Sequence, residues 1–129
     1  MIVADSNLIA CCVLKSEATT AALALREREP VWYVPRLWRY EMLNILATMI
    51  KAKRLARSDA ESIYCQLLDA LQTSEKDPDP SSVLSLVERY GISGYDAHFV
   101  ALAHGLGVKL YTQDKELLQK FPDVAVRWS

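Results

Sequence analysis

Two acidic residues directly follow apolar segments that are typical of short buried strands. Asp5 comes after residues 1–4, and Asp114 comes after residues 108–111 and the short step Thr112-Gln113. In an open α/β sheet, ligands bind in the crevice outside the carboxyl ends of the strands. The sequence therefore predicts that both carboxylates lie at an edge of a sheet where a ligand site can form.

Two further acids lie on predicted helices. Asp96 is in the first turn of a helix predicted for residues 95–106, which contains no proline and stops at Gly107. Glu41 lies in the middle of another predicted helix, and Asn44 falls on the same face one turn later, beside the apolar stripe. A carboxylate and an amide at the edge of a core need a polar partner, which favours a functional site.

Carboxylates that converge on one spot raise one another's pKa values unless a cation neutralises them. Oxygen ligands without a His or Cys cluster select Mg²⁺, or Mn²⁺, over zinc. His98 and His104 are six positions apart on one predicted helix and point to different faces, so we assign both to packing or surface. Magnesium held by carboxylates is the usual arrangement for phosphoryl chemistry, with one ion or with two about 3.5–4 Å apart.

Three of the four acids also have an ordinary structural explanation. Asp5 and Asp114 are typical N-caps of the short helices that follow them. Ser93-Gly94-Tyr95-Asp96 is itself a capping-box pattern. Glu41 is mid-helix and has no such explanation, so it is the residue that favours a clustered metal site over three unrelated caps.

The order of predicted elements indicates the fold class. Strands are predicted at 1–4, 31–34, 108–111 and, at an edge, 124–127. Helices are predicted at 7–14, 17–29 with Ser16 as cap, 36–54 as the longest, 58–71 opened by the capping box Ser58-Asp59-Ala60-Glu61, 80–91, 95–106 and 115–120, with residues 72–80 as the only polar linker. This alternation predicts one α/β domain over residues 1–129, a three-layer α/β/α arrangement around a mainly parallel sheet of four to five short strands.

Composition narrows the function classes. A net charge of −1 argues against binding nucleic acid over the whole surface and leaves local patches as the route. The three cysteines, Cys11, Cys12 and Cys65, match neither a disulfide framework nor zinc-ligand spacing, so reduced thiols and a cytoplasmic location are expected. The sequence shows no signal-peptide pattern and no apolar run of membrane length, so no membrane association is expected.

Four short motifs resemble those of a known family. The segments VADSN, YEMLN, YDAHFVALA and LYTQDKEL occur in this order along the whole chain. Together they resemble the PIN-domain nucleases, and especially the VapC-like toxins of type II toxin–antitoxin pairs. By this resemblance, Asp5, Glu41, Asp96 and Asp114 form the acidic quartet that binds Mg²⁺, with Ser6, Thr112 and Asn44 as its supporting polar residues. The small hydroxyl residue after the first acid varies in position in this family, so the match at Ser6 is looser than at Asp5.

The resemblance implies a magnesium-dependent endoribonuclease that leaves a 5′-phosphate and a 3′-hydroxyl. It also implies a cognate antitoxin, which silences the enzyme in its own cell, and a homodimer. For the RNA substrate, the sequence offers a basic stretch in which Glu41 is the only acid: Arg36, Arg39, Lys51, Lys53, Arg54 and Arg57. This stretch is either a phosphate-binding track or a solvated helix face, and the sequence supports both readings equally.

Other functions fit less well. Haloacid-dehalogenase enzymes need a second Asp two positions after the first, where this chain has Asn7. Response-regulator receivers need an acidic pair near the first strand and a Lys after a late strand, whereas Asp5 has no acidic neighbour and Lys109 does not follow its strand. No P-loop or G-x-G-x-x-G motif occurs. A non-catalytic RNA- or protein-binding module on the same fold, and a housekeeping RNA-processing nuclease, stay open as alternatives.

Overall fold

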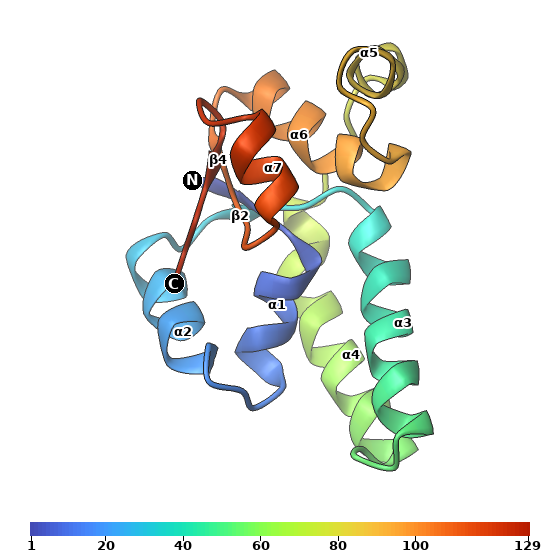
Figure 1. Ribbon diagram of the computed structural model, residues 1–129. Helices are drawn as coiled ribbons and strands as arrows, with labels where there is room; N and C mark the ends of the chain where they lie inside the picture. Colours follow the sequence, from blue (N-terminus) through green and yellow to red (C-terminus); the bar gives the residue numbers. More distant parts are fainter.

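The computed structural model describes residues 1–129, with a four-stranded sheet at the centre (Figure 1). The strands are β1 (Ile2–Ala4), β2 (Trp32–Tyr33), β3 (Lys109–Tyr111) and β4 (Ala125–Val126), in the order β2-β1-β3-β4. All neighbouring pairs are parallel, and Val3 on β1 is in register with both Tyr33 and Leu110. The predicted α/β class with a mainly parallel sheet of four to five short strands is confirmed, with four strands, all parallel.

Seven α-helices and one short 3₁₀-helix surround the sheet. They are α1 (Ser6–Val13), α2 (Thr19–Arg28), α3 (Leu37–Lys51), α4 (Arg57–Leu71), η1 (Gln72–Ser74), α5 (Pro80–Tyr90), α6 (Gly94–Leu106) and α7 (Lys115–Lys120). No helix is both long enough and apolar enough to cross a membrane.

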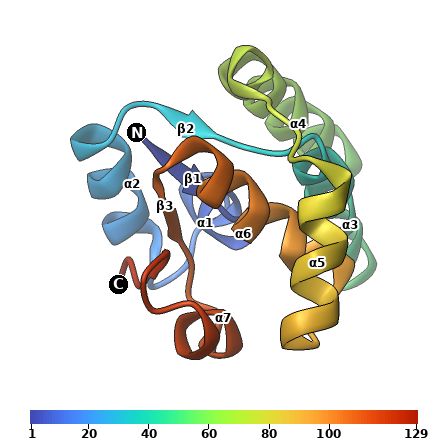
Figure 2. The same cartoon turned by 90° about the horizontal axis from the view of Figure 1, so that it is seen from above.

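The buried side chains of β1 divide the core into two parts. Ile2 and Ala4 belong to a cluster with residues of α1 to α4, while Val3 belongs to a second cluster with residues of α5, α6 and α7. Successive side chains of a strand point to opposite faces of the sheet, so each cluster occupies one face. Figure 2 shows β1 and β3 between α2 on one side and α6 on the other, in keeping with the predicted three-layer arrangement.

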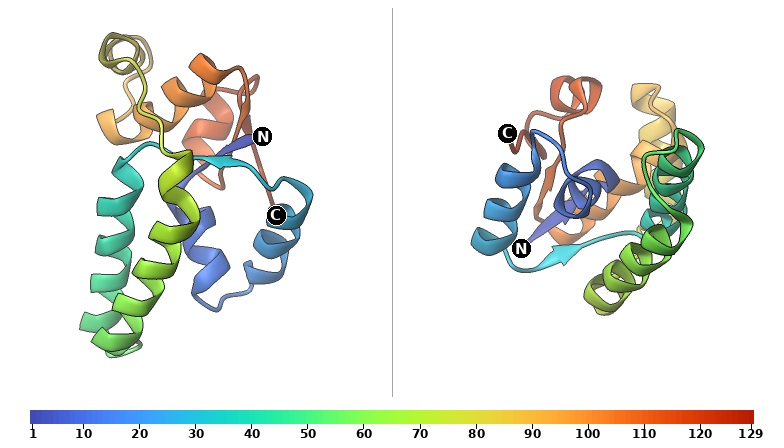
Figure 3. Two further views of the ribbon diagram at one scale, coloured as in Figure 1. Left: turned by 180° about the vertical axis from the view of Figure 1, so that it is seen from behind. Right: turned by 90° about the horizontal axis from the view of Figure 1, so that it is seen from below.

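Helices α3 and α4 form a hairpin that extends away from the sheet, side by side in both views of Figure 3. Trp38 is fully buried at its base and stacks on Tyr64 with 5.9 Å between ring centroids. The helix predicted for residues 36–54 is too long, because the chain turns at Lys53, whose φ is 58°. It is not the single longest helix either, since α3 and α4 each have 15 residues.

Two predicted helix caps are wrong. Helix α4 begins at Arg57 with Ala56 as its N-cap, so Ser58 lies inside the first turn and forms no capping box. Helix α2 begins at Thr19, and Ser16 instead accepts a hydrogen bond from the backbone N–H of Ala18 in the preceding turn. In both places the chain path between packed helices sets the first helical residue, and the local cap pattern does not.

The helix ends that position the predicted site follow local rules. Ser93 is the N-cap of α6 and accepts a hydrogen bond from the N–H of Asp96 at 3.0 Å. At the far end Gly107 has a φ of 67°, a left-handed conformation that glycine adopts without steric cost. These two ends fix the length of α6 and hold Asp96 in its first turn.

Candidate active site

One cavity of about 540 Å³ lies between the first turns of α1, α6 and α7 and the side of α3. Its walls include every acid that the sequence singles out, together with their predicted supporting residues: Asp5, Ser6, Glu41, Asn44, Asp96, Thr112 and Asp114. The tertiary structure thus brings together side chains that are up to 109 positions apart in the sequence.

Asp5 is held by two hydrogen bonds. One carboxylate oxygen, Oδ1, accepts from the backbone N–H of Leu8 at 2.8 Å, so Asp5 is the N-cap of α1. The other oxygen, Oδ2, accepts from the hydroxyl of Thr112 at 2.6 Å. Thr112 is completely buried, and its oxygen also accepts from the backbone N–H of Asp114 at 3.0 Å. One hydroxyl therefore ties the loop after β3 to the loop after β1.

Glu41 is held in a similar way from the neighbouring helix. The buried hydroxyl of Ser6, at the start of α1, donates a hydrogen bond of 2.6 Å to Oε1 of Glu41 on α3. Asn44 lines the same cavity one turn further along α3. Ser6 thus orients the glutamate, which leaves its second carboxylate oxygen available for another partner.

Asp114 and Asp96 complete the acidic wall. Asp114 is the N-cap of α7, and its Oδ1 accepts from the backbone N–H of Leu117 at 3.0 Å. Asp5 and Asp114 are therefore N-caps, as their positions in the sequence predict. In both Asp5 and Asp114 only one carboxylate oxygen serves as the cap, and both side chains line the cavity. Capping and a place in the site therefore occur together.

Burial raises the pKa of three of these carboxyl groups. The pKa of Asp5 rises from 3.8 to about 6, mainly through burial, although the Thr112 and Leu8 hydrogen bonds lower it and the charges of Glu41 and Asp114 raise it. The pKa values of Glu41 and Asp96 also rise, first through burial. Mutual repulsion adds to this, because Asp96 raises the pKa of Glu41 and Asp114 raises that of Asp96. The carboxylates of the site therefore repel one another, and a bound cation would neutralise this repulsion.

The donor set fits a hard divalent cation. All charged side chains in the cavity wall are carboxylates, which suit Mg²⁺ or Mn²⁺. As the side chains lie, no three His, Cys, Asp or Glu residues are close enough together to hold one ion directly. Mg²⁺ usually keeps several waters and binds through one or two carboxylates, so an open cavity of this size suits a hydrated ion.

The predicted basic stretch is divided between two places. Arg36 and Arg39 lie at the start of α3, next to the cavity. Lys51, Lys53 and Arg54 are exposed at the tip of the α3–α4 hairpin, about 15 Å further along the helix axis than Glu41. They line neither the acid cavity nor the groove beside it. Contact between RNA and any of these five residues remains a prediction.

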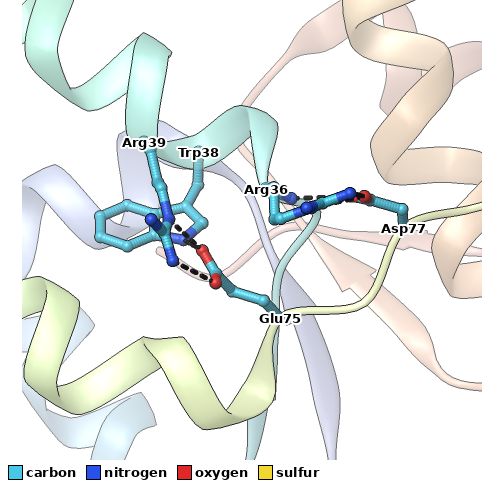
Figure 4. Close-up of polar contacts among 5 residues, drawn as sticks. All are labelled: Arg36, Trp38, Arg39, Glu75 and Asp77. Atoms are coloured by element: carbon cyan, nitrogen blue, oxygen red, sulfur yellow. Dashed lines mark hydrogen bonds and ion pairs between the residues drawn. The ribbon is translucent and has the colours of Figure 1, made fainter.

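Acidic residues of the linker hold the start of α3 in place (Figure 4). Glu75 accepts from Nε and Nη2 of Arg39, both at 2.6 Å, and from the indole N–H of Trp38 at 2.7 Å. Asp77 accepts from the backbone N–H and Nε of Arg36 at 2.9 and 2.8 Å. The hydrogen bond from Arg39 lowers the pKa of Glu75. These contacts fix the helix that carries Glu41.

Three further residues at the site lie outside the predicted set of acids and supporting residues. Tyr40 and Tyr95 are exposed at the cavity wall, and each directly precedes an acid. His98 lies close enough to Glu41 for its charge to lower the glutamate's pKa. The repeated order of Tyr before Glu41 and before Asp96 is the sequence signal that could have identified the two tyrosines.

Comparison with known families identifies the class of protein. The PIN-domain family profile matches residues 2–124, and the chain therefore belongs to the PIN-domain family. Within this class it is similar to Ribonuclease VapC3 of Pyrobaculum aerophilum, with 27% identity over 124 residues, which cover 94% of this chain and 95% of the relative. The resemblance predicted from the four motifs is confirmed.

Solved structures share the fold. PAE2754 from Pyrobaculum aerophilum superposes with a TM-score of 0.74 at 24% identity, over 95% of this chain and 87% of the other. A toxin–antitoxin complex from Klebsiella pneumoniae gives 0.71 at 14% identity, over 100% and 98%. FitAcB from Neisseria gonorrhoeae gives 0.72 at 18% identity, over 98% and 96%. At these identities the similarity shows the fold alone.

Proposed function

We propose that this protein is a metal-dependent endoribonuclease that hydrolyses RNA phosphodiester bonds with Mg²⁺, or with Mn²⁺ in its place. The observation that carries the proposal is the convergence of four acids from four separate segments on one cavity, where buried hydroxyls hold two of them. The similarity to a protein named Ribonuclease VapC3 supports the choice of RNA as substrate.

Each residue has a defined task in this proposal. Asp5, Glu41, Asp96 and Asp114 would hold the hydrated metal, directly or through its waters, and Ser6 and Thr112 keep two of these carboxylates in orientation. Asn44 contributes a neutral polar group beside them. When bound, the metal supplies an activated water and neutralises charge at the phosphate, and the products are a 5′-phosphate and a 3′-hydroxyl.

The proposal extends to the biological role of a toxin. The chain shares its fold with a protein from a toxin–antitoxin complex of Klebsiella pneumoniae, and this supports an antitoxin as partner. A ribonuclease active in its own cell needs such an inhibitor. A homodimer is part of the same proposal. A housekeeping nuclease and a non-catalytic binding module are the alternatives, and an intact set of four acids argues against the second.

The direct test is cleavage of a 5′-labelled RNA by the purified protein. We expect cleavage with Mg²⁺, none with EDTA, and none with Asp96→Asn under either condition. Asp79→Asn is the matched control, because Asp79 caps α5 through the N–H of Ser82 but does not line the acid cavity. Wild-type protein that leaves RNA intact, or an Asp96→Asn variant that cleaves at the normal rate, contradicts the proposal.

A further inference from the structure

A second groove adjoins the acid cavity. It encloses about 740 Å³, and it shares Leu37 and Tyr40 with the wall of the cavity, so the two hollows lie side by side at the start of α3. Its other walls come from the linker, from α5 and from His98 on α6. A chain-like ligand bound at the acids can therefore reach this groove by passing over Leu37 and Tyr40.

The two hollows differ in charge. The cavity wall carries four carboxylates and no cation, while beside the groove Arg36 and Arg39 are each paired with a linker carboxylate, Asp77 and Glu75. An RNA chain whose scissile phosphate lies at the acids must place its neighbouring phosphates elsewhere, because carboxylates repel them. Arginine pairs well with phosphate oxygens, so the groove is the adjoining surface that suits them.

Arg36 is held ready for such a contact. Asp77 binds its backbone N–H, its Nε and its Nη2, the last at 2.7 Å, yet the side chain stays 69% exposed. Figure 4 shows Asp77 binding Arg36 separately from the pair between Glu75 and Arg39. A guanidinium that is already oriented loses less conformational freedom when it binds a ligand.

Exposed apolar side chains flank the same groove. Tyr40, on the wall shared with the cavity, is 69% exposed, and Leu84 across the groove is exposed to the same extent. The ring of His98 is fixed by a 2.6 Å contact between Nδ1 and the carbonyl oxygen of Gly94. Exposed aromatic rings beside cationic groups are the usual means of binding single-stranded nucleic acid, because any base can stack on them.

We infer that this groove is the subsite for the RNA nucleotides next to the scissile phosphate, with Arg36 contacting a phosphate and Tyr40 stacking on a base. The inference rests on the proposed function, because it takes RNA as the substrate. An acidic peptide is disfavoured as the occupant, because the carboxylates of the adjoining cavity would repel it and no metal would bridge the two.

The test measures RNA binding apart from cleavage. A fluorescein-labelled, mixed-sequence single-stranded RNA is titrated with Asp96→Asn protein, alone and combined with Tyr40→Ala or Arg36→Gln, over a series of salt concentrations. We expect Tyr40→Ala to weaken binding roughly 5- to 150-fold. We expect Arg36→Gln to reduce the slope of log affinity against log salt by about 0.7, which is the loss of one phosphate contact. Arg28→Gln, an exposed change on α2, should alter neither quantity.

The outcomes separate the groove from the proposed function. Unchanged affinity and salt slope in both variants, or no RNA binding at all, overturns the subsite even if the wild type cleaves RNA. Loss of binding in both variants, with a wild type that does not cleave, keeps the groove as an RNA site and removes the nuclease. Competition by a poly-glutamate peptide as effective as by unlabelled RNA assigns the groove to an acidic peptide. If Arg36→Gln lowers the melting temperature, its effect on RNA binding is not counted. The test of the subsite then rests on Tyr40→Ala alone, because the Tyr40 side chain is exposed.

Discussion

The hydroxyl of Thr112 donates a 2.6 Å hydrogen bond to Oδ2 of Asp5, a residue 107 positions away in the chain. The same oxygen accepts from the backbone N–H of Asp114. Thr112 has no exposed surface, so its side of both bonds is shielded from solvent. The first and last acids of the proposed site are therefore coupled through one buried side chain.

Replacing this hydroxyl should affect both stability and the site. Thr112→Val keeps the shape but removes the partner of Oδ2 of Asp5 and of the N–H of Asp114, which should cost roughly 1–3 kcal/mol. Chemical denaturation in EDTA measures the loss, and the RNA cleavage rate should fall with it. Thr112→Ser retains the hydroxyl and serves as the control. Equal destabilisation by both variants would mean that the methyl group, not the hydrogen bonds, is what the site requires.

Removing one negative charge should stabilise the metal-free protein. Burial and the charge of Asp114 raise the pKa of Asp96, so its ionised form destabilises the folded state at neutral pH. Asp96→Asn should therefore melt at a higher temperature than the wild type in EDTA. In Asp5→Asn the gain should be smaller, because asparagine has one acceptor oxygen for the two hydrogen bonds that Asp5 accepts.

With Mg²⁺ the wild type should melt at a higher temperature than Asp96→Asn, the reverse of their order in EDTA. An ion that binds only the folded protein adds about 2.7 kcal/mol at a hundredfold excess over its dissociation constant. We expect that shift in the wild type and in Asp79→Asn, and a much smaller one in Asp96→Asn. Thermal melts with EDTA and with Mg²⁺ measure all three proteins. Equal magnesium-dependent shifts in the melting temperatures of the three proteins would contradict the metal site.

The stability of the metal-free protein should depend on pH through Asp5. Its pKa is about 6 in the folded state, against 3.8 for an aspartate in an unfolded chain. The folded state therefore holds this proton more tightly, and ionisation of Asp5 costs roughly 3 kcal/mol of stability at a pH above 6. The penalty declines as the pH falls through 6 and is absent below 3.8. Denaturation of wild type and Asp5→Asn across this range should show the wild type gaining on the variant towards acid. A constant difference between the two proteins excludes the raised pKa.

Glu41 and Asn44 should differ in their effect on metal binding. Glu41→Gln removes a charged ligand and should abolish the magnesium-dependent melting shift. Asn44→Ala removes a neutral neighbour and should weaken affinity roughly 10- to 100-fold, as loss of an outer partner does. Magnesium titrations followed by the melting shift give both affinities. A larger loss in Asn44→Ala would exchange the two roles.

The linker acid Glu75 should be important for stability. Its side chain is 8% exposed and binds both Trp38 and Arg39, so Glu75→Ala leaves an indole N–H and a guanidinium without partners. We expect a cost of about 2–3 kcal/mol. The control is Glu61→Ala, which breaks the exposed pair with Arg57 on α4 and should cost under about 1 kcal/mol. Equal melting temperatures for the two variants would show that the linker does not hold α3.

Local patterns were enough to predict much of this protein. The apolar segments before Asp5 and Asp114 are strands, and the predicted helix of Asp96 starts and ends within one residue of the observed one. The parallel sheet follows from the alternation of strands and helices. These features depend on interactions between residues that are close in the chain, which is why the sequence by itself determined them.

The path of the chain decided the rest. In the sequence the basic stretch looks like one continuous track. In the structure Arg39 pairs with Glu75, 36 positions away, and Arg36 pairs with Asp77, 41 positions away. Lys53 and its neighbours instead lie at the hairpin tip. Likewise, no spacing rule brings Thr112 to Asp5. Ion pairs and hydrogen bonds between distant segments depend on which elements the sheet sets side by side. Only the tertiary structure therefore decided that Arg39 is held by Glu75, whereas Arg36 keeps a 69% exposed side chain although Asp77 binds it.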